Sequence, residues 1–282
     1  MRTLNQNEIN LFKSDLYPLR LFLEGNGMFD LRIKTVFDVT TFQIATKEEL
    51  NGAEGIVDNE NNSIVVLDTL VSNNYERART IYHELGHKML GQKNIGISKY
   101  NFLLEKILEL KQENPTELPL DPIIYAYGLK CLEEYLVEIF SQTACKYAKG
   151  INPPEKRNYL TPSICSDYGY DSNFGNNYGV FQTPCETLIN NIFGNNDNAI
   201  RASFNLEYFS SFFETSNNVE MMKLLGNLGQ IYGATQTKAG YNLDGINQHD
   251  PNYIKQLIID SNTKAQKITR QFPQKSNGRH HK

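Results

Sequence analysis

The sequence lacks the features that would place the protein in a membrane, an oxidising compartment or a complex with nucleic acid. No apolar run approaches the roughly 18 residues of a membrane-spanning helix, and residues 1–18 lack the cationic and apolar regions of a signal peptide, so neither a span nor Sec-dependent export is expected. The 4 cysteines lie far apart without a CxxC pair, which favours reduced thiols in the cytoplasm over a disulfide. A net charge of -4 argues against a nucleic-acid partner, which needs a positive face.

The composition is that of a folded protein. The 282 residues suffice for one substantial core and a smaller second one, with 40% hydrophobic and 21% charged residues. Apolar spacing predicts an N-terminal helix over residues 8–24, broken near Pro18. Two β-rich stretches follow, Val36–Ala45 and Gly55–Leu67, and the second contains the turn-forming residues 59–62 and is predicted to be a hairpin.

Helical patterns dominate the rest of the chain. Three helices are predicted at Tyr75–Leu90, Lys99–Glu113 and Ile124–Lys149. The Asn-, Gly- and Tyr-rich segment that follows is long for an ordinary connection. Beyond it, further helices are expected at Pro184–Phe193, Ala199–Glu214, Asn218–Tyr232 and Pro251–Ser261.

The motif that carries chemistry is His83-Glu84-Leu85-Gly86-His87. Two imidazoles one helical turn apart lie on the same face and can both reach one tetrahedral zinc ion. Glu84 lies about 100° round the helix from His83, so its carboxylate stays outside the ligand set and can accept a proton from an activated water. Gly86 lowers helix propensity by about 1 kcal/mol, which suggests a close-packing reason.

A catalytic zinc ion needs a third protein ligand. The remaining histidines, His249, His280 and His281, lie in the C-terminal segment, so the acidic cluster on the third predicted helix is the better donor. Glu134 and Glu138 share a face with Cys131 and Ser141, which favours Glu134, whereas Glu133 shares its face with Val137 and Phe140. Glu133 remains the alternative ligand. If no metal binds, the acidic cluster is interpreted as a solvent-exposed surface of the helix.

Together these motifs resemble the catalytic domain of anthrax lethal factor and its relatives, a gluzincin-type family that includes secreted Pro-Pro endopeptidases. The matching features are HELGH and, after an intervening helix, Tyr127-Gly128, then Glu134 seven residues after the tyrosine, and a further glutamate and aromatic residue. The resemblance covers roughly residues 55–145. It implies that Glu134 is the third ligand, that Glu138 supports the metal shell, and that Tyr127 hydrogen-bonds an oxyanion, with Tyr125 as a rival.

The arginine-containing approach to HELGH is also similar to ImmA-type regulatory peptidases. The predicted fold is therefore α+β, a zincin-like core with a small mixed sheet, an active-site helix and a glutamate helix, followed by a mainly helical C-terminal region. The predicted divisions are residues 1–150 for the catalytic domain, 151–184 for a polar loop, 185–262 for the helical region and 263–282 for a flexible basic tail.

The predicted function is that of a zinc-dependent endopeptidase acting on a protein or peptide substrate. The run Ile64, Val65, Val66 and Leu67 is either an edge strand that binds an extended peptide or an ordinary core strand. The enzyme would act in the cytoplasm, or leave without a Sec signal and act on a host protein as a toxin or effector. The alternatives are an ImmA-like regulatory peptidase and a non-catalytic zinc-containing binding module.

Overall fold

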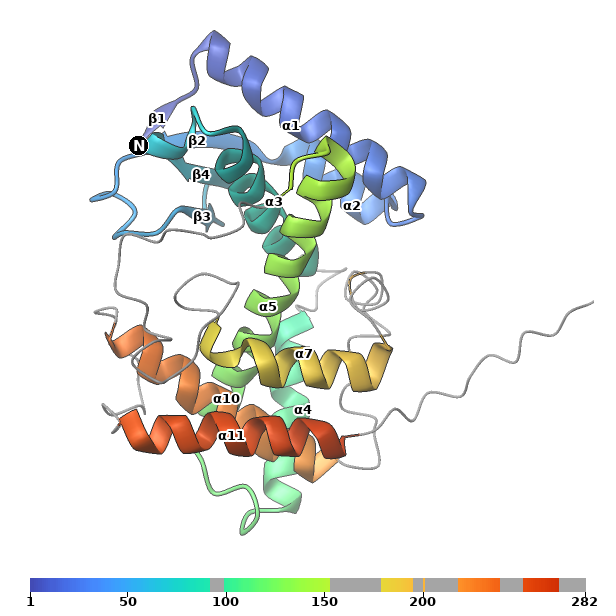
Figure 1. Ribbon diagram of the computed structural model, residues 1–282, viewed down its shortest axis with the longest axis vertical. Helices are drawn as coiled ribbons and strands as arrows, with labels where there is room; N and C mark the ends of the chain where they lie inside the picture. Colours follow the sequence, from blue (N-terminus) through green and yellow to red (C-terminus); the bar gives the residue numbers. More distant parts are fainter. Residues whose placement is uncertain (92–98, 153–178, 195–199, 201–217, 239–250, 269–282) are drawn as a thin grey trace, which may run out of the picture.

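The computed structural model describes residues 1–91, 99–152, 179–194, 200, 218–238 and 251–268. A small four-stranded mixed sheet lies at one end of the molecule, and helices make up most of the rest (Figure 1). The predicted combination of a small mixed sheet and a mainly helical remainder is confirmed. Within these residues, no helix combines the length and the apolar character needed to cross a membrane.

The sheet places one strand of the predicted hairpin at its edge and the other inside. Its order is β1-β2-β4-β3, formed by Arg2–Thr3, Thr41–Ala45, Ser63–Leu67 and Gly55–Asp58. β3 and β4 pair antiparallel, as predicted, and β2 runs parallel to β4 on its other side. All residues of β4 are buried, and both of its edges are already paired. The proposed edge-strand role of Ile64, Val65, Val66 and Leu67 is therefore wrong.

The first helix is longer than expected and is not interrupted at its proline. Asn5 forms a capping box at the start of α1 (Gln6–Gly25), which satisfies free backbone donors there. The helix continues through Pro18, so the predicted break is wrong. Buried side chains on both sides of the proline, Phe12 and Leu19, pack into the core and hold the two halves in one helix.

A second helix replaces the first part of the predicted strand Val36–Ala45. In α2 (Leu31–Val39), the Asp30 side chain accepts a hydrogen bond from the Ile33 amide at 2.8 Å and so caps the helix. Ile33 and Val36 are three residues apart and both buried, which is helical spacing. The strand prediction is therefore wrong before residue 40 and confirmed for β2.

Two helices bring the motif residues together. α3 (Asn74–Gly91) contacts both the sheet and α5 (Pro122–Lys149). α4 (Lys99–Glu113) packs against α3 and α5. All three agree in type and extent with the predicted helices. A Cβ atom at Gly86 would lie only 3.1 Å from the Cβ of Val137, so this glycine allows α3 and α5 to approach closely. The expected packing reason for Gly86 is confirmed.

The C-terminal helices lie at the end of α5 that is farther from the sheet (Figure 1); two of them contact α5, and the last packs on those two. They are α7 (Gly179–Phe193), α10 (Asn218–Lys238) and α11 (Pro251–Lys267), and each contains a predicted helix. Buried side chains from α1 through α11 form one hydrophobic cluster, so the expected boundary at residue 150 does not separate two cores. Most of 151–184, all of the predicted helix 199–214 except residue 200, and most of the tail 263–282 lie outside the described residues.

α5 and α10 cross without room for a side chain at two points. A Cβ atom at Gly128 would collide with the backbone oxygen of Leu225, and one at Gly229 with that of Ile124. Gly128→Ala is expected to lower the free energy of unfolding by about 1–3 kcal/mol, because a backbone must move. Denaturant midpoints measure this, with Gly25→Ala as the control, since a Cβ there meets nothing within 4 Å. An unchanged Gly128→Ala midpoint would show that the helices do not meet here.

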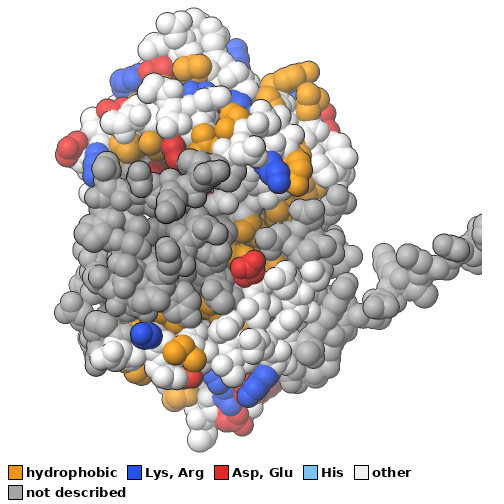
Figure 2. All heavy atoms as spheres, in the orientation of Figure 1, with side chains coloured by type: hydrophobic (Ala, Val, Ile, Leu, Met, Phe, Trp, Pro, Cys, Tyr) orange, Lys and Arg blue, Asp and Glu red, His pale blue; other side chains and the backbone are white. Residues whose placement is uncertain are grey.

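The described surface carries charges of both signs. Figure 2 shows acidic and basic side chains interspersed with separate apolar ones over the described residues of one face. This mixture agrees with the net charge of -4. On this face, the described residues therefore offer no continuous basic stripe of the kind that binds a nucleic-acid backbone.

Candidate metal centre

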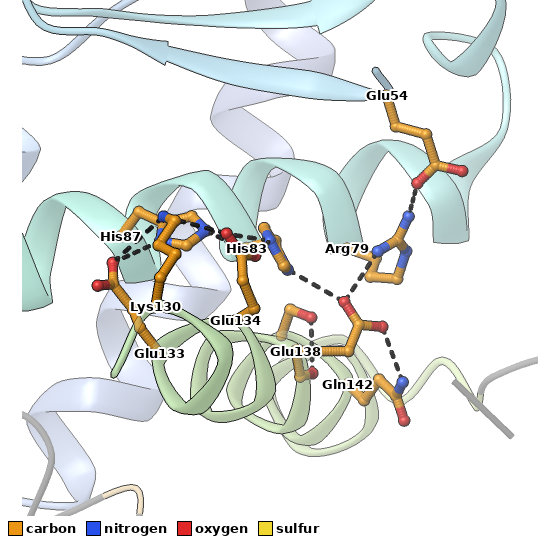
Figure 3. A network of polar contacts seen from close by, with 10 residues as sticks. Glu54, Arg79, His83, His87, Lys130, Glu133, Glu134, Glu138 and Gln142 are labelled. Atoms are coloured by element: carbon orange, nitrogen blue, oxygen red, sulfur yellow. Dashed lines mark hydrogen bonds and ion pairs between the residues drawn. The ribbon is translucent and has the colours of Figure 1, made fainter. Parts of the chain in front are cut away.

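Two histidines from α3 and one glutamate from α5 bring three donor atoms together. Nε2 of His83 and Nε2 of His87 lie 3.2 Å apart. The Oε2 atom of Glu134 lies 3.4 Å from the first nitrogen and 3.3 Å from the second. The three side chains converge between the two helices (Figure 3). They form a group that can hold a metal ion.

The spacing of these atoms matches one face of a tetrahedron around zinc. Zinc lies about 2.0–2.1 Å from nitrogen or carboxylate ligands, so tetrahedral geometry puts the ligand atoms about 3.3 Å apart. The three measured separations, 3.2, 3.3 and 3.4 Å, all agree with that value. Two imidazoles and a carboxylate are also a known donor set for catalytic zinc. The donors therefore fit this ion.

Two further carboxylates from α5 orient the histidines. Oε2 of Glu138 lies 3.0 Å from Nδ1 of His83, and Oε1 of Glu133 lies 2.7 Å from Nδ1 of His87. A carboxylate that accepts a hydrogen bond from Nδ1 keeps a hydrogen on that nitrogen, so Nε2 of each histidine would be the atom that binds a metal ion in place of a proton. Glu133, Glu134 and Glu138 are all buried, so the reading as a solvated acidic surface is wrong.

The electrostatics of the centre favour a positive charge. Burial by itself would lower the pKa of His83, but hydrogen bonds with Glu134 and Glu138 outweigh it and raise that pKa to about 10. Burial would raise the pKa of Glu138, but the charge of Arg79 and the bond with His83 lower it to about 2. The lowered pKa of Glu138 and the raised pKa of His83 both show that this site stabilises positive charge between the carboxylates, which suits a bound cation.

Glu84 lies beside the start of β3. Its side chain is 8% exposed, and no described residue donates a hydrogen bond or forms an ion pair with its carboxylate. A Cβ atom at Gly55 would come within 3.1 Å of Oε1 of Glu84 and within 2.6 Å of the Thr80 methyl group. Gly55 therefore lets the edge strand approach α3 closely at Glu84.

Tyr127 and its rival Tyr125 have different surroundings. The hydroxyl of Tyr125 accepts a hydrogen bond from the Leu120 amide at 3.3 Å, which directs it to the loop before α5. Tyr127 lies two turns before Glu134, and its half-buried ring packs against that of Tyr232 in α10, with centroids 6.2 Å apart. The C-terminal region thus supplies a second aromatic ring beside Tyr127.

Sequence reasoning missed two basic residues of the centre. Nζ of Lys130 lies 3.0 Å from Oε1 of Glu134, the oxygen that does not face the histidines. Nη1 of Arg79 lies 3.0 Å from Oε2 of Glu138. The signal for both was helical spacing, because Lys130 precedes Glu134 by four residues and Arg79 stands one turn before His83 on the same face.

Comparison of the chain with protein-family models, curated proteins and solved structures gives no match. The likeness to lethal factor therefore stays an expectation from the motifs around His83 and Tyr127. The basis for a function is the centre itself, with its three converging donors, the orienting carboxylates and Glu84.

Alanine replacement can test which of the two adjacent glutamates is the third metal ligand. Glu134→Ala is expected to weaken zinc binding by roughly 100-fold or more, because it removes a ligand atom. Glu133→Ala should weaken it by only about tenfold, as is usual for a group that orients a ligand. Chelator competition measures both, with Glu109→Ala as the control, since that side chain is 61% exposed on α4. The reverse ranking would make Glu133 the ligand.

Proposed function

We propose that the protein is a zinc-dependent endopeptidase. The observation that carries this proposal is the convergence of His83, His87 and Glu134 at the spacing of tetrahedral zinc ligands, with Glu84 beside them in sequence and no described partner for its carboxylate. Three protein donors leave a fourth position open, as catalytic zinc sites require. Zinc in this position would supply Lewis acidity, polarising a carbonyl group and making water a stronger acid.

The protein side chains would perform the remaining chemistry. Glu84 would accept a proton from the attacking water and transfer it to the leaving amine. Tyr127 would donate a hydrogen bond to the oxygen that becomes negative as the carbonyl is attacked. Glu133 and Glu138 would keep the histidines in the tautomer that leaves Nε2 free for the metal.

The substrate in this proposal is an extended peptide that pairs with β3. Among the described strands, β3 pairs only with β4, so its other edge can accept a further strand. Gly55 begins β3 directly beside Glu84, which would bring a paired peptide to the centre. β3 thus takes the role that the sequence suggested for β4.

The alternative functions differ from the proposed one in the number of metal ligands or in the substrate. A non-catalytic module with structural zinc would need a fourth protein ligand, and the described residues supply three His, Cys or acidic donors to this group. An ImmA-like regulatory peptidase would share the chemistry and differ in its substrate. Action in the cytoplasm and action on a host protein after Sec-independent secretion both stay proposals.

Digestion of a peptide library tests the proposal directly. Zinc-loaded protein is incubated with a library from a whole proteome, and new peptide termini are identified by mass spectrometry. We expect cleavage at a restricted set of sequences, loss of cleavage with a chelator, and recovery when zinc is added back. A zinc-loaded protein that cleaves nothing, or whose metal shows four side-chain ligands in a crystal structure, would contradict the proposal.

A further inference from the structure

Arg79 is a buried guanidinium that binds carboxylates from three parts of the chain. Its side chain is 4% exposed. It donates to Glu138 of α5, to Glu76 one turn earlier on α3, and to Glu54, the residue before β3 (Figure 3 shows the first and last contacts). A guanidinium has several donors in a fixed plane, so it can hold three partners at set positions. Lysine lacks this geometry.

On the metal side, one carboxylate oxygen joins Arg79 to a ligand. Oε2 of Glu138 lies 3.0 Å from Nη1 of Arg79 and 3.0 Å from Nδ1 of His83. The other oxygen accepts a hydrogen bond from Gln142 at 2.8 Å, and the Glu138 side chain is 0% exposed. Glu138 is therefore fixed on both sides, and a shift of Arg79 would change the orientation of His83.

On the sheet side, Glu54 fixes the beginning of the edge strand. Its carboxylate pairs with Nη2 of Arg79, and its backbone oxygen accepts a hydrogen bond from the Leu67 amide at 2.9 Å. The next residue, Gly55, packs against Glu84. The position of Glu54 thus sets how closely β3 lies against the general base in the proposed mechanism.

We infer that Arg79 is a positioning residue that couples the docking of β3 to metal binding at His83. The coupling runs from Glu54 through Arg79 and Glu138 to His83, and it rests on the metal site of the proposed function. Zinc on His83 holds Glu138 and Arg79 in place, and Arg79 then holds the start of the strand on which the substrate pairs. The bound metal would in this way order the peptide-binding edge.

Amide hydrogen exchange of β3 with and without zinc tests the coupling without any measurement of hydrolysis. Zinc is expected to slow exchange of the Gly55–Asp58 amides about fivefold or more, the lower end of usual coupling between two sites. Glu54→Ala should abolish this slowing. Because coupling is reciprocal, the same variant should weaken zinc binding by a similar factor, although Glu54 touches no ligand.

Glu76→Ala is the matched control, because it also removes one carboxylate from Arg79 but leaves both the strand contact and the Glu138 contact. It should keep the slowing of β3 exchange and the zinc affinity. Arg79→Lys should behave like Glu54→Ala. If β3 exchange is unaffected by zinc in the wild-type protein, or is slowed equally in Glu54→Ala, the coupling is absent. A wild-type protein that binds no zinc would instead overturn the proposed function, and the coupling with it.

Discussion

Replacement of His83 by alanine is expected to abolish zinc binding at stoichiometric concentrations. Structural zinc sites with four ligands bind with apparent free energies of roughly 10–16 kcal/mol, so one ligand contributes about 3 kcal/mol, equivalent to roughly 100-fold in affinity or more. The loss should be at the upper end here, because removal of the imidazole also leaves the buried carboxylate of Glu138 without one of its partners. His87→Ala should act in the same way.

Zinc content after dialysis, determined by elemental analysis, measures this effect, and circular dichroism reports whether the fold survives. His249→Ala is the matched control, because it removes a histidine that the proposed centre does not use. We expect about one zinc ion per chain in the wild-type protein and in His249→Ala. Full zinc content in His83→Ala would exclude the proposed site.

The sequence predicts the convergence of His83, His87 and Glu134 well, because this convergence depends on local helical geometry. Spacing of four residues places His83 and His87 on one face whatever surrounds α3, and Glu134 follows from the same rule applied to α5. The structure explains why two adjacent glutamates both reach the centre. His83 and His87 lie one turn apart, so the carboxylate of Glu134 reaches Nε2 of both. The carboxylate of the preceding residue, Glu133, contacts Nδ1 of His87.

Strand order could not be predicted in the same way. The run Ile64–Leu67 is buried on both faces, and such a run fits an interior strand as well as a covered edge strand. The parallel pairing of β2 with β4 decides between them, and it joins segments that are separated along the chain by residues 46–62, which include β3. Similarly, Val36 has a β-branched side chain, but the Asp30 cap and burial beside Ile33 place it in a helix.

Local sequence patterns also could not predict the role of the C-terminal region. The sequence permitted a separate recognition unit or a cover for the catalytic part. The close crossing of α10 with α5 at Gly128 and the contact of Tyr232 with Tyr127 favour a cover that contributes to the surroundings of the centre.

The other large effect is expected from Glu84→Gln. Glutamine has nearly the same shape and can accept a hydrogen bond, but its amide does not take a proton from water near neutral pH. General-base catalysis by a positioned side chain usually contributes about 10²- to 10⁴-fold, so kcat/KM for any peptide that the wild-type enzyme cleaves should fall by that factor. Zinc content and the unfolding midpoint should not change, because Glu84 is neither among the three donors nor paired with a described residue.

This combination of results separates a general base from the other roles that a buried glutamate can have. If Glu84 were a fourth ligand, Glu84→Gln would lower the zinc content. If it stabilised the fold, Glu84→Gln would lower the unfolding midpoint. Glu109→Gln is the control, since its exposed side chain lies on α4 and should retain full activity. Wild-type cleavage rates in zinc-loaded Glu84→Gln would rule out the proton transfer assigned to this residue, even if the metal centre proved correct.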